Sequence, residues 1–561
     1  MKKIIYLFAI ATLFSCSDFL DITPKGVLSD AQVSSPDKVD NTVNAAYASL
    51  GNDHYDKPFS LWPYGNVRSG DAYKGGRDEG DIQNFYFMEI FKNVKSDFGE
   101  LDGLWFQYYV GISRANSALK TLNTLTEADF PKLKIRQAEC RFIRAHYYFQ
   151  LKEIWKYVPF IDETIAIADY PTISNRVLTN DQLWDKIADD FKFGVDNLPA
   201  IQTEIGRANK AAATAYLAKT RLFQAYEQDD RNNVTTINAT KLQQVVDLIN
   251  TIPATYGLVG DYADLFTPGA TENGNESLFA IQFSDKGDGT TFGRLNFGDV
   301  LATPMGIGCC DFHKPSKNLA NAFKTDANGL PMFDTYDAAP LDLSTDKVDP
   351  RLNHTIAIPG HPWKYDPTTL YQVSWNRTPD VYGVYASLKE NVCKTCYTQV
   401  GPFYGNTKNR MILRFADVLL MKAEALIELG GGANLETARQ IINQIRTRAA
   451  NSTAHLKMAD NSFESQFNVG TYGLAGWDQS YARKALRWER RLELAMEGNR
   501  FFDLVRWGIA DTYMNGYFAS EKSKIAYLKN GLFTKNRDEY LPIPDNQMRF
   551  SKGVYTQNVG Y

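Results

Sequence analysis

The sequence lacks the features that identify several common classes of protein. No block of five or six like charges occurs, and 61 Lys and Arg are outnumbered by 65 Asp and Glu. No stretch beyond residue 14 is long and apolar enough to cross a bilayer. Metalloprotease, nucleophile-elbow, phosphate-loop and dinucleotide-binding motifs are missing as well. These absences argue against a nucleic-acid-binding protein, a membrane-spanning protein and the commonest enzyme classes.

Aromatic residues, by contrast, are abundant. The chain has 31 Tyr, 33 Phe and 9 Trp among 561 residues, of which 44% are hydrophobic and 22% charged, as in folded globular proteins. Its length allows three or four domains of about 150 residues or one long repeat array. A core needs fewer rings than this, so we expect some of them to form surfaces that stack on an uncharged partner.

The first residues have the pattern of an export signal. Two lysines precede an apolar run at 4–14 that is too short to span roughly 30 Å of hydrocarbon but suits a secretory signal. The run ends in Leu-Phe-Ser-Cys, which resembles a bacterial lipobox. We therefore expect a signal peptide over 1–15, lipid on Cys16 and a polar tether over 16–30, with the rest of the chain outside the cytoplasm. An ordinary signal peptide with a chance cysteine is the alternative.

Apolar residues that recur at steps of three and four predict amphipathic helices. These helices form consecutive pairs with a period of roughly 34 to 45 residues, which predicts an all-α, mainly helical fold built as a tetratricopeptide-like stack. The expected pairs are 101–123 with 131–155, 181–197 with 208–227, and 410–429 with 434–449.

The helical pattern divides the chain into three parts. We expect an N-terminal helical part over 31–254, a loop-rich variable region over 255–405 and a C-terminal helical part over 406–561, because glycine and proline interrupt the middle region. A short strand at 277–283 is the exception within it. A second glycine-rich aromatic stretch occupies 59–80. Binding residues concentrate in loops carried by a rigid frame, so we expect the site in these two stretches.

Five cysteines follow Cys16, and four of them form two pairs. In an oxidising compartment, both pairs, Cys309 with Cys310 and Cys393 with Cys396, are interpreted first as disulfides. A disulfide between the adjacent Cys309 and Cys310 would be strained, because neighbouring Cα atoms lie about 3.8 Å apart, so it is expected only if the local backbone is held for a purpose. A zinc site that includes His313 is the alternative, but the spacing matches no common zinc module. The fifth cysteine, Cys140, lies in a helical pattern and is predicted to be a small buried hydrophobe.

Charged residues offer no clear catalytic or metal-binding set. Asp285, Asp288 and Asp299 could meet a structural calcium ion, but a solvated acidic loop fits their spacing better. Arg414 and Asp417 are close enough for a local ion pair. A further set is predicted to connect helices and not to act in acid/base chemistry: Arg487, Glu489, Arg490, Arg491, Glu493 and Glu497.

Two long motifs resemble the SusD/RagB family. Residues 413–425 read Leu-Arg-Phe-Ala-Asp-Val-Leu-Leu-Met-Lys-Ala-Glu-Ala, and residues 487–508 begin Arg-Trp-Glu-Arg-Arg-Leu-Glu-Leu. Shorter matches occur at 16–21, 349–352 and 541–544, so the resemblance covers essentially the whole mature chain. It implies a lipid-anchored, cell-surface protein of the Bacteroidetes outer membrane that has a tetratricopeptide-like frame. It also implies that the protein captures oligosaccharide and closes as a lid on a SusC-like TonB-dependent transporter.

A sugar site needs an apolar plate for the C–H face and polar groups for the hydroxyls. The expected ligand-binding residues are the aromatics Trp62, Tyr73, Trp375 and Tyr404, the polar Arg68, Asp71, Asn376 and Arg377, and a joined Cys309–Cys310 pair as a rigid plate. Together with Arg377 and Tyr404, that pair resembles fructan-binding members of the family. No catalytic residue is predicted. A binder of peptide or another non-glycan nutrient and a surface glycoside hydrolase are the alternatives.

Overall fold

A computed structural model describes residues 38–285 and 294–561 of the chain. The expected signal peptide, lipidated Cys16 and tether lie outside these ranges. Helix accounts for 44% of the structure and strand for 11%, which confirms a mainly helical fold. In the part of the chain that the structure describes, no helix is long and apolar enough to cross a membrane.

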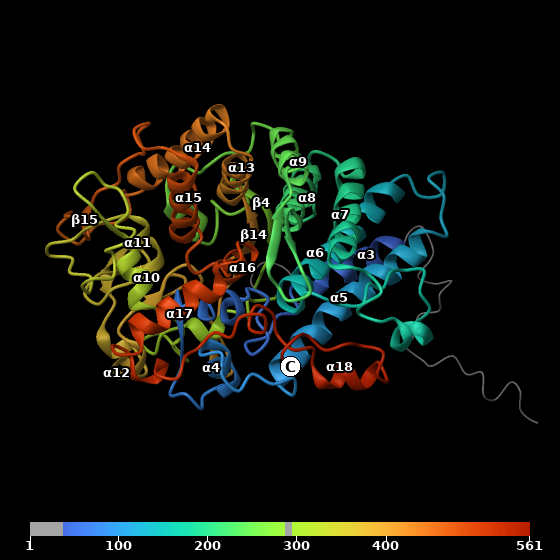
Figure 1. Cartoon of the computed structure of the whole chain (residues 1–561), viewed down its shortest axis with the longest axis horizontal. Coiled ribbons are helices and arrows are strands. Elements are labelled where there is room, and N and C mark those ends of the chain that lie inside the picture. Colours follow the sequence, from blue (N-terminus) through green and yellow to red (C-terminus); the bar gives the residue numbers. More distant parts are fainter. Residues whose placement is uncertain (1–37, 286–293) are drawn as a thin grey trace, which may run out of the picture.

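Nine helices in the described ranges form one continuous array, in which each packs on the next (Figure 1). They are α3 (Val39–Ser49), α5 (Gly99–Leu122), α6 (Leu133–Trp155), α7 (Asn180–Asn197), α8 (Lys210–Ala225), α9 (Ala239–Asn250), α13 (Phe415–Leu429), α14 (Gly432–Asn451) and α15 (Gln479–Glu493). The first two predicted pairs are therefore confirmed as α5–α6 and α7–α8. Helix α9, which the apolar pattern did not reveal, packs on α13 and joins the two helical parts.

Local sequence explains how these helices begin and pack. Helix α7 starts with a capping box in which the Thr179 hydroxyl accepts from the Gln182 backbone and the Gln182 side chain accepts from the Thr179 backbone. The Asn209 side chain caps α8 in a similar way. Six of the 13 buried residues of α8 are alanines, and small side chains let its neighbours approach closely.

The third predicted pair needs a correction at its start. Residues 410–414 were expected to be helical, but they form strand β14 (Arg410–Arg414), which pairs antiparallel with β4 (Ser277–Ile281). The strand predicted at 277–283 is thereby confirmed over its first five residues. The apolar residues of a short strand can fit helical spacing when a helix follows directly. This explains why residues 410–414 were predicted to be helical.

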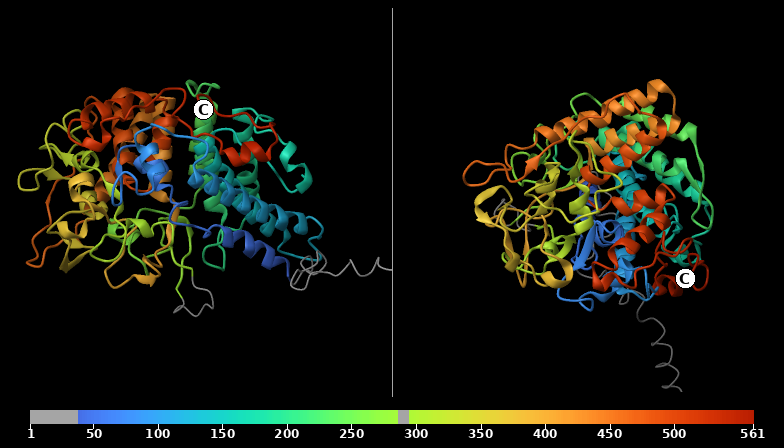
Figure 2. Two further views of the ribbon diagram at one scale, coloured as in Figure 1. Left: turned by 90° about the horizontal axis from the view of Figure 1, so that it is seen from below. Right: turned by 60° about the vertical axis from the view of Figure 1, so that its left-hand side comes forward.

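The loop-rich region lies beside the helical array and is coloured from green to yellow in Figures 1 and 2. It holds short helices and small sheets, namely β5 (Phe312–Pro315), α10 (Lys317–Ala322), β6 (Lys324–Thr325), β7 (Lys347–Val348), α11 (Arg351–Thr355), β8 (Ile356–Ala357), β9 (Pro362–Trp363), β10 (Asp366–Leu370), α12 (Pro379–Tyr382), β11 (Ala386–Ser387), β12 (Thr398–Val400) and β13 (Phe403–Gly405). Strand β1 (Ala72–Gly75) pairs with β5, so the N-terminal loop joins this region.

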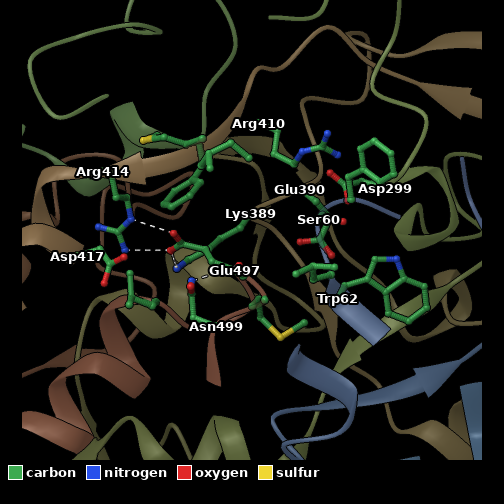
Figure 3. A pocket seen from close by; sticks show the side chains of 18 of the residues that line it. Ser60, Trp62, Asp299, Lys389, Glu390, Arg410, Arg414, Asp417, Glu497 and Asn499 are labelled. Carbon is green, nitrogen blue, oxygen red and sulfur yellow. Dashed lines mark hydrogen bonds and ion pairs between the residues drawn. The ribbon is translucent and has the colours of Figure 1, made fainter. Parts of the chain in front are cut away.

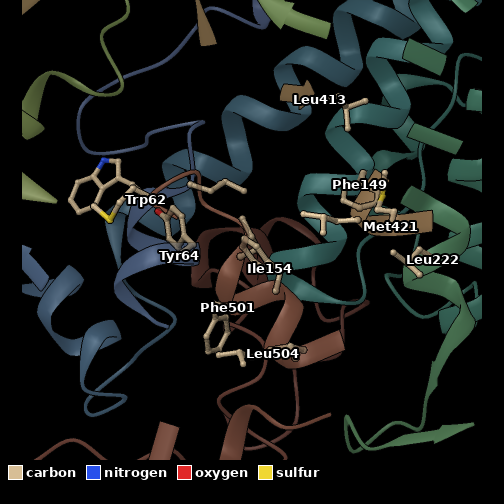
Figure 4. Packing of buried hydrophobic residues seen from close by; sticks show 14 of the residues in the cluster. Trp62, Tyr64, Phe149, Ile154, Leu222, Leu413, Met421, Phe501 and Leu504 are labelled. Carbon is tan, nitrogen blue, oxygen red and sulfur yellow. The ribbon is translucent and has the colours of Figure 1, made fainter. Parts of the chain in front are cut away.

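One large hydrophobic cluster connects the helical array to the rest of the chain. It includes Phe149 and Leu222 of the array, Trp62 of the N-terminal loop and Phe501 of α16 (Arg500–Arg506) (Figure 4). Cys140 is fully buried in a smaller cluster, as predicted.

Buried ion pairs connect the C-terminal motif, residues 487–508, to other elements. Glu493 contacts Arg414, Arg448 and Arg351, each buried. Burial alone would raise the pKa of Glu493, but these three guanidinium groups hold it well below its usual value. The expectation that this motif connects helices is confirmed. The expected Arg414–Asp417 pair is wrong, because Asp417 pairs with Arg490 at 2.8 Å.

Candidate functional site

Four of the ten predicted site residues are buried inside the protein. Trp62, Arg68, Asp71 and Tyr73 are each at most 2% exposed. None of them can offer a surface to a sugar, so their assignment as ligand-binding residues is corrected. The glycine-rich stretch that carries them runs through the interior and not across the surface.

Each of the four has a structural partner that explains its burial. Trp62 begins the π-helix η1 (Trp62–Val67) and stacks on His313 with a ring separation of 5.2 Å. Arg68 donates to the Asp538 carbonyl, and burial lowers the pKa of Arg68 to about 10. Asp71 pairs with a buried arginine, and the Tyr73 hydroxyl accepts from a backbone N–H.

Trp62 also lines a polar cavity of about 120 Å³. Figure 3 shows the Arg414 side chain reaching Glu497 there, with Lys389 and Asn499 beside them. Burial lowers the pKa of Lys389 to about 8, although its ion pair with Glu497 acts in the opposite direction. Most of the charged groups around this cavity are paired within the protein, so it is a poor candidate for the functional site.

The other six predicted residues gather around one loop, residues 304–311. We call this area the cystine surface and define it by Gly306, Gly308, Cys309, Cys310, Trp375, Arg377 and Tyr404. Both cysteine pairs are joined as disulfides, as the sequence predicts, and the peptide between Cys309 and Cys310 is cis. Cys309 is half-buried, so one side of the disulfide reaches the surface.

Two glycines let the aromatic rings lie directly on this loop. A Cβ on Gly308 would come within 2.1 Å of the Tyr404 ring, and one on Gly306 within 2.2 Å of the Trp375 ring. The Met305 backbone N–H also donates to the Trp375 carbonyl at 2.8 Å. Backbone contact of this closeness fixes the positions of both rings relative to the disulfide.

Tyr404 is the most available aromatic residue of the cystine surface. It is half-buried, and its hydroxyl makes no hydrogen bond to any residue of the described ranges. Trp375 is only 9% exposed and packs against Trp363 and Tyr371. Tyr404 therefore presents both a ring and a free polar group, whereas Trp375 mainly supports the surface from below.

Arg377 supplies the polar side of the cystine surface. Its guanidinium lies 3.1 Å from Asp81, and its side chain remains 29% exposed. Its backbone N–H donates to Asp311, the residue after Cys310, and this bond holds the arginine beside the disulfide. The Arg377 guanidinium and the Asp81 carboxylate thus offer a donor and an acceptor of the kind that sugars need, 3.1 Å apart.

Asn376 does not belong to the accessible part of this surface. Its side-chain oxygen accepts from Lys314 and Tyr371, its amide donates to the Val373 carbonyl, and it is 6% exposed. Its polar atoms are thus used inside the protein, and its assignment as a ligand-binding residue is corrected.

Two residues of the site were not predicted from the sequence. Asp81 pairs with Arg377, which lies 296 positions away, so no local signal could identify it. Lys394 is exposed in the Cys393–Cys396 loop and holds its ammonium group 5.4 Å from the Trp375 ring centroid. The cysteine spacing in the sequence predicts that loop, but it does not show that Lys394 of the loop lies over Trp375.

No metal site is evident in the ranges that the structure describes. No group of three or more His, Cys, Asp or Glu side chains is placed to hold an ion there. Cys309, Cys310, Cys393 and Cys396 are used in disulfides, which contradicts the alternative of a zinc site. For the possible calcium site, Asp288 lies outside the described residues.

Comparison with protein families gives two matches along the chain. Residues 275–561 match the model described as the SusD family, and residues 18–222 match the model described as "Starch-binding associating with outer membrane". The first model covers just over half of the chain. The description of the second indicates association with the outer membrane.

Individual relatives agree with these matches over nearly their full lengths. "SusD-like protein P25" of Formosa agariphila is 26% identical over 90% of this chain and 89% of its own. A SusD homologue from Bacteroides thetaiotaomicron has a TM-score of 0.69 at 19% identity, over 94% of this chain and 97% of that one. "Surface glycan-binding protein A" of the same species, in complex with laminarihexaose, has a TM-score of 0.61 at 20% identity, over 93% and 99%. The structural likenesses establish a shared fold.

Proposed function

The chain belongs to the SusD family, and we propose that it binds a neutral oligosaccharide at the cystine surface, outside the cell. Proteins of this family bind carbohydrate and are not enzymes. One observation carries the choice of surface: Tyr404, Arg377 and the Cys309–Cys310 disulfide meet on one loop and remain accessible. This combination joins an apolar plate to polar groups, as a sugar ring requires.

We assign a role in sugar binding to each group of the cystine surface. The Tyr404 ring and the disulfide offer flat apolar area to the C–H face of a sugar, while the Tyr404 hydroxyl remains free for a hydroxyl of the ligand. The Arg377–Asp81 pair presents a donor and an acceptor 3.1 Å apart, a spacing suited to neighbouring hydroxyls. Because this pair is neutral overall, it favours an uncharged ligand over an acidic one.

A fructan is our first choice of ligand. Its support is the combination of an adjacent-cysteine disulfide with Arg377 and Tyr404, which resembles fructan-binding members of the family. Laminarin is the competing neutral glycan, because a neighbour of the same fold was solved with laminarihexaose. Both have exposed hydroxyls and C–H faces, so the test must include both.

We further propose that the bound sugar passes to a SusC-like TonB-dependent transporter while the protein stays anchored by lipid on Cys16. The family membership and the lipobox-like end of the export signal support this role. A polar tether over 16–30 would connect the lipid to the globular part. Co-purification of a transporter subunit with the full-length chain from native membranes tests the partnership, and repeated recovery of the lipoprotein alone would contradict it.

Calorimetric titration of the purified protein with fructan and laminarin oligosaccharides tests the site. Tyr404→Ala and Arg377→Ala should each weaken binding about tenfold or more, because each removes contacts worth about 1 to 2 kcal/mol. Tyr170→Ala is the matched control, since Tyr170 is a half-exposed tyrosine on a different surface. Unchanged affinity in both site variants would reject the cystine surface as the binding site.

Assays of cleavage and of binding to a glycan array separate the competing functions. Binding without cleavage supports the proposal, whereas release of reducing ends would indicate a glycoside hydrolase. Failure of the wild-type protein to bind any glycan of a broad array would favour a peptide or another nutrient as the ligand.

A further inference from the structure

The four residues Cys393-Lys394-Thr395-Cys396 form a small loop at the surface of the protein. The loop lies between β11 and β12 and is closed by the Cys393–Cys396 disulfide. Lys394, Thr395 and Cys396 are exposed, and Cys393 is half-buried. The two sulfur atoms do not belong to the cystine surface, so this disulfide is a separate chemical feature of the molecule.

Cys396 is the sulfur that a reductant can reach. Thiol–disulfide exchange begins when a thiolate attacks one sulfur of a disulfide, so the reaction depends on access to that sulfur. In the other disulfide, Cys310 is buried and Cys309 is half-buried. Exposed disulfides are the labile and regulatory ones in proteins. We therefore expect the two disulfides to differ in reactivity.

Thr395 and Lys394 can stabilise the sulfur that leaves. The Thr395 hydroxyl lies 3.4 Å from Cys393 Sγ, within hydrogen-bond reach of a sulfur atom. A disulfide sulfur carries no proton, so the hydroxyl is the donor. Lys394 adds a positive charge next to Cys393 in the chain, and a nearby cation stabilises a thiolate. Because a stabilised thiolate leaves faster, Cys393 is the better leaving group and Cys396 the sulfur that is attacked.

Hydrogen bonds at both ends of the loop do not depend on the disulfide. The Cys396 backbone N–H donates to the Cys393 carbonyl at 2.9 Å. The Tyr397 hydroxyl donates to the Asn391 side-chain oxygen at 2.7 Å and accepts from the Val392 backbone N–H at 3.2 Å. These bonds fix the segments on either side of the loop. Reduction should therefore leave the fold intact and loosen only the loop itself.

Lys394 connects the loop to the cystine surface. Its ammonium group lies 5.4 Å from the Trp375 ring centroid, a separation at which a cation is attracted to the face of an indole. While the disulfide is closed, the short ring restricts the positions that Lys394 can take. An open loop gives the lysine more freedom, so reduction should weaken its contact with Trp375.

We propose that Cys393–Cys396 is a thiol–disulfide exchange site whose co-reactant is a soluble dithiol, and that its reduction releases Lys394 from Trp375. The exposed sulfur, the hydroxyl donor beside its partner and the adjacent cation all lie within four residues. The inference goes beyond the proposed function, because the exchange chemistry needs no bound glycan.

The exchange has two steps that balance. In the first, a thiolate of the dithiol attacks Cys396 Sγ, a bond forms between these two sulfur atoms, and Cys393 leaves as a thiolate and takes a proton from water. In the second, the other thiolate of the reductant attacks the reductant sulfur of the mixed disulfide, and Cys396 leaves and is protonated in turn. The protein gains two electrons and two protons. The dithiol loses both and becomes a cyclic disulfide.

Alkylation of the folded protein after treatment with dithiothreitol tests the exchange site. Mass spectrometry should find iodoacetamide on Cys393 and Cys396, with the Cys309–Cys310 disulfide still closed because Cys310 is buried. Cys140 is a fully buried free thiol, so its lack of label verifies that the protein stays folded. Unlabelled Cys393 and Cys396, or an equal or faster reaction at Cys309–Cys310, would overturn the exchange site, whatever the protein does with glycans.

The rate of labelling tests how the loop assists the reaction. Lys394→Gln and Thr395→Val should each slow reduction by about two- to fivefold, the range that a solvent-exposed interaction allows. Lys120→Gln is the control, because Lys120 is an exposed lysine on a different element, α5. Wild-type rates in both loop variants would overturn the assignment of Cys393 as the leaving group.

Tryptophan fluorescence tests the release of Lys394. Reduction should change the emission of the wild-type protein, because a cation leaves the Trp375 ring. Cys393→Ser combined with Cys396→Ser should have the emission of the reduced protein and should not respond to the dithiol. Trp375→Phe should remove the difference between the oxidised and reduced forms. An unchanged wild-type spectrum after full labelling of both cysteines would overturn the release of Lys394.

Discussion

Asp71 and Arg491 form an ion pair inside the protein, with 2.7 Å between Arg491 Nη2 and Asp71 Oδ1, although 420 positions separate them in the chain. Arg491 is fully buried and also donates to Asn318. The contact joins the N-terminal loop, the C-terminal motif and the loop-rich region. It is one reason why the glycine-rich stretch at 59–80 lies inside the protein.

Removal of Arg491 should destabilise the fold strongly. Arg491→Met leaves the Asp71 carboxylate buried without its partner, and such losses cost about 3 to 5 kcal/mol of unfolding free energy. Chemical denaturation at neutral pH measures the change. Lys192→Ala is the control, because Lys192 and Asp196 form an ion pair whose side chains are about half exposed, and such pairs contribute less than about 1 kcal/mol. Similar losses in the two variants would contradict a structural role for the Asp71 pair.

Helix pairs were predictable because a helix that buries one face repeats its apolar residues at fixed steps. Helices α5 to α8 follow that rule, and their bounds agree with the sequence within about three residues. Strand β14 was not predictable in this way, since its partner β4 lies more than 100 residues earlier in the chain. Short strands depend on such distant partners, and local spacing does not show them.

The candidate site was predictable only in part, and for a similar reason. Cys309, Arg377 and Tyr404 were identified from residue type and family resemblance, and the structure brings them to one loop. The stretch that carries Trp62 and Tyr73 is also rich in glycine and aromatic residues, yet the pairing of β1 with β5 places these two side chains inside the protein. Exposure depends on long-range packing, so residue type alone could not separate the two stretches.

Gly308 should be essential for binding but not for folding. Gly308→Ala places a methyl group where the Tyr404 ring lies, so the half-exposed ring should move away from the disulfide and glycan affinity should fall about tenfold. Calorimetry measures the affinity, and circular dichroism verifies the fold. Gly473→Ala is the control, because an added Cβ there has no neighbour within 4 Å. Retained affinity in Gly308→Ala would show that contact between Tyr404 and the loop is unnecessary.

Glu153 should make stability depend on pH. Burial raises the pKa of Glu153 to about 8, with Lys219 opposing the shift. A glutamate in the unfolded chain has a pKa of about 4.3. Between about pH 4.3 and pH 8, the folded state therefore binds more protons at this group than the unfolded state does. Stability from this group therefore falls as the pH rises through that range.

Replacement of Glu153 should remove this dependence. Glu153→Gln should raise the free energy of unfolding at pH 8 by about 1 to 3 kcal/mol and have little effect near pH 4. Thermal unfolding at a series of pH values measures the difference from wild type, and Glu127→Gln provides an exposed control. A gain that is the same at every pH would mean that the carboxyl does not titrate in this range.

Cys16 should determine where the protein is found in the cell. Cys16→Ala removes the only thiol of the lipobox-like sequence, so the exported chain should have no lipid and appear in the soluble envelope fraction. Detergent partition of fractionated cells measures the change, and Ser17→Ala serves as the control because it keeps the cysteine. Cys16 is not part of the cystine surface, so the variant should keep its glycan affinity. Retention of Cys16→Ala in the membrane would contradict lipid anchoring at this residue.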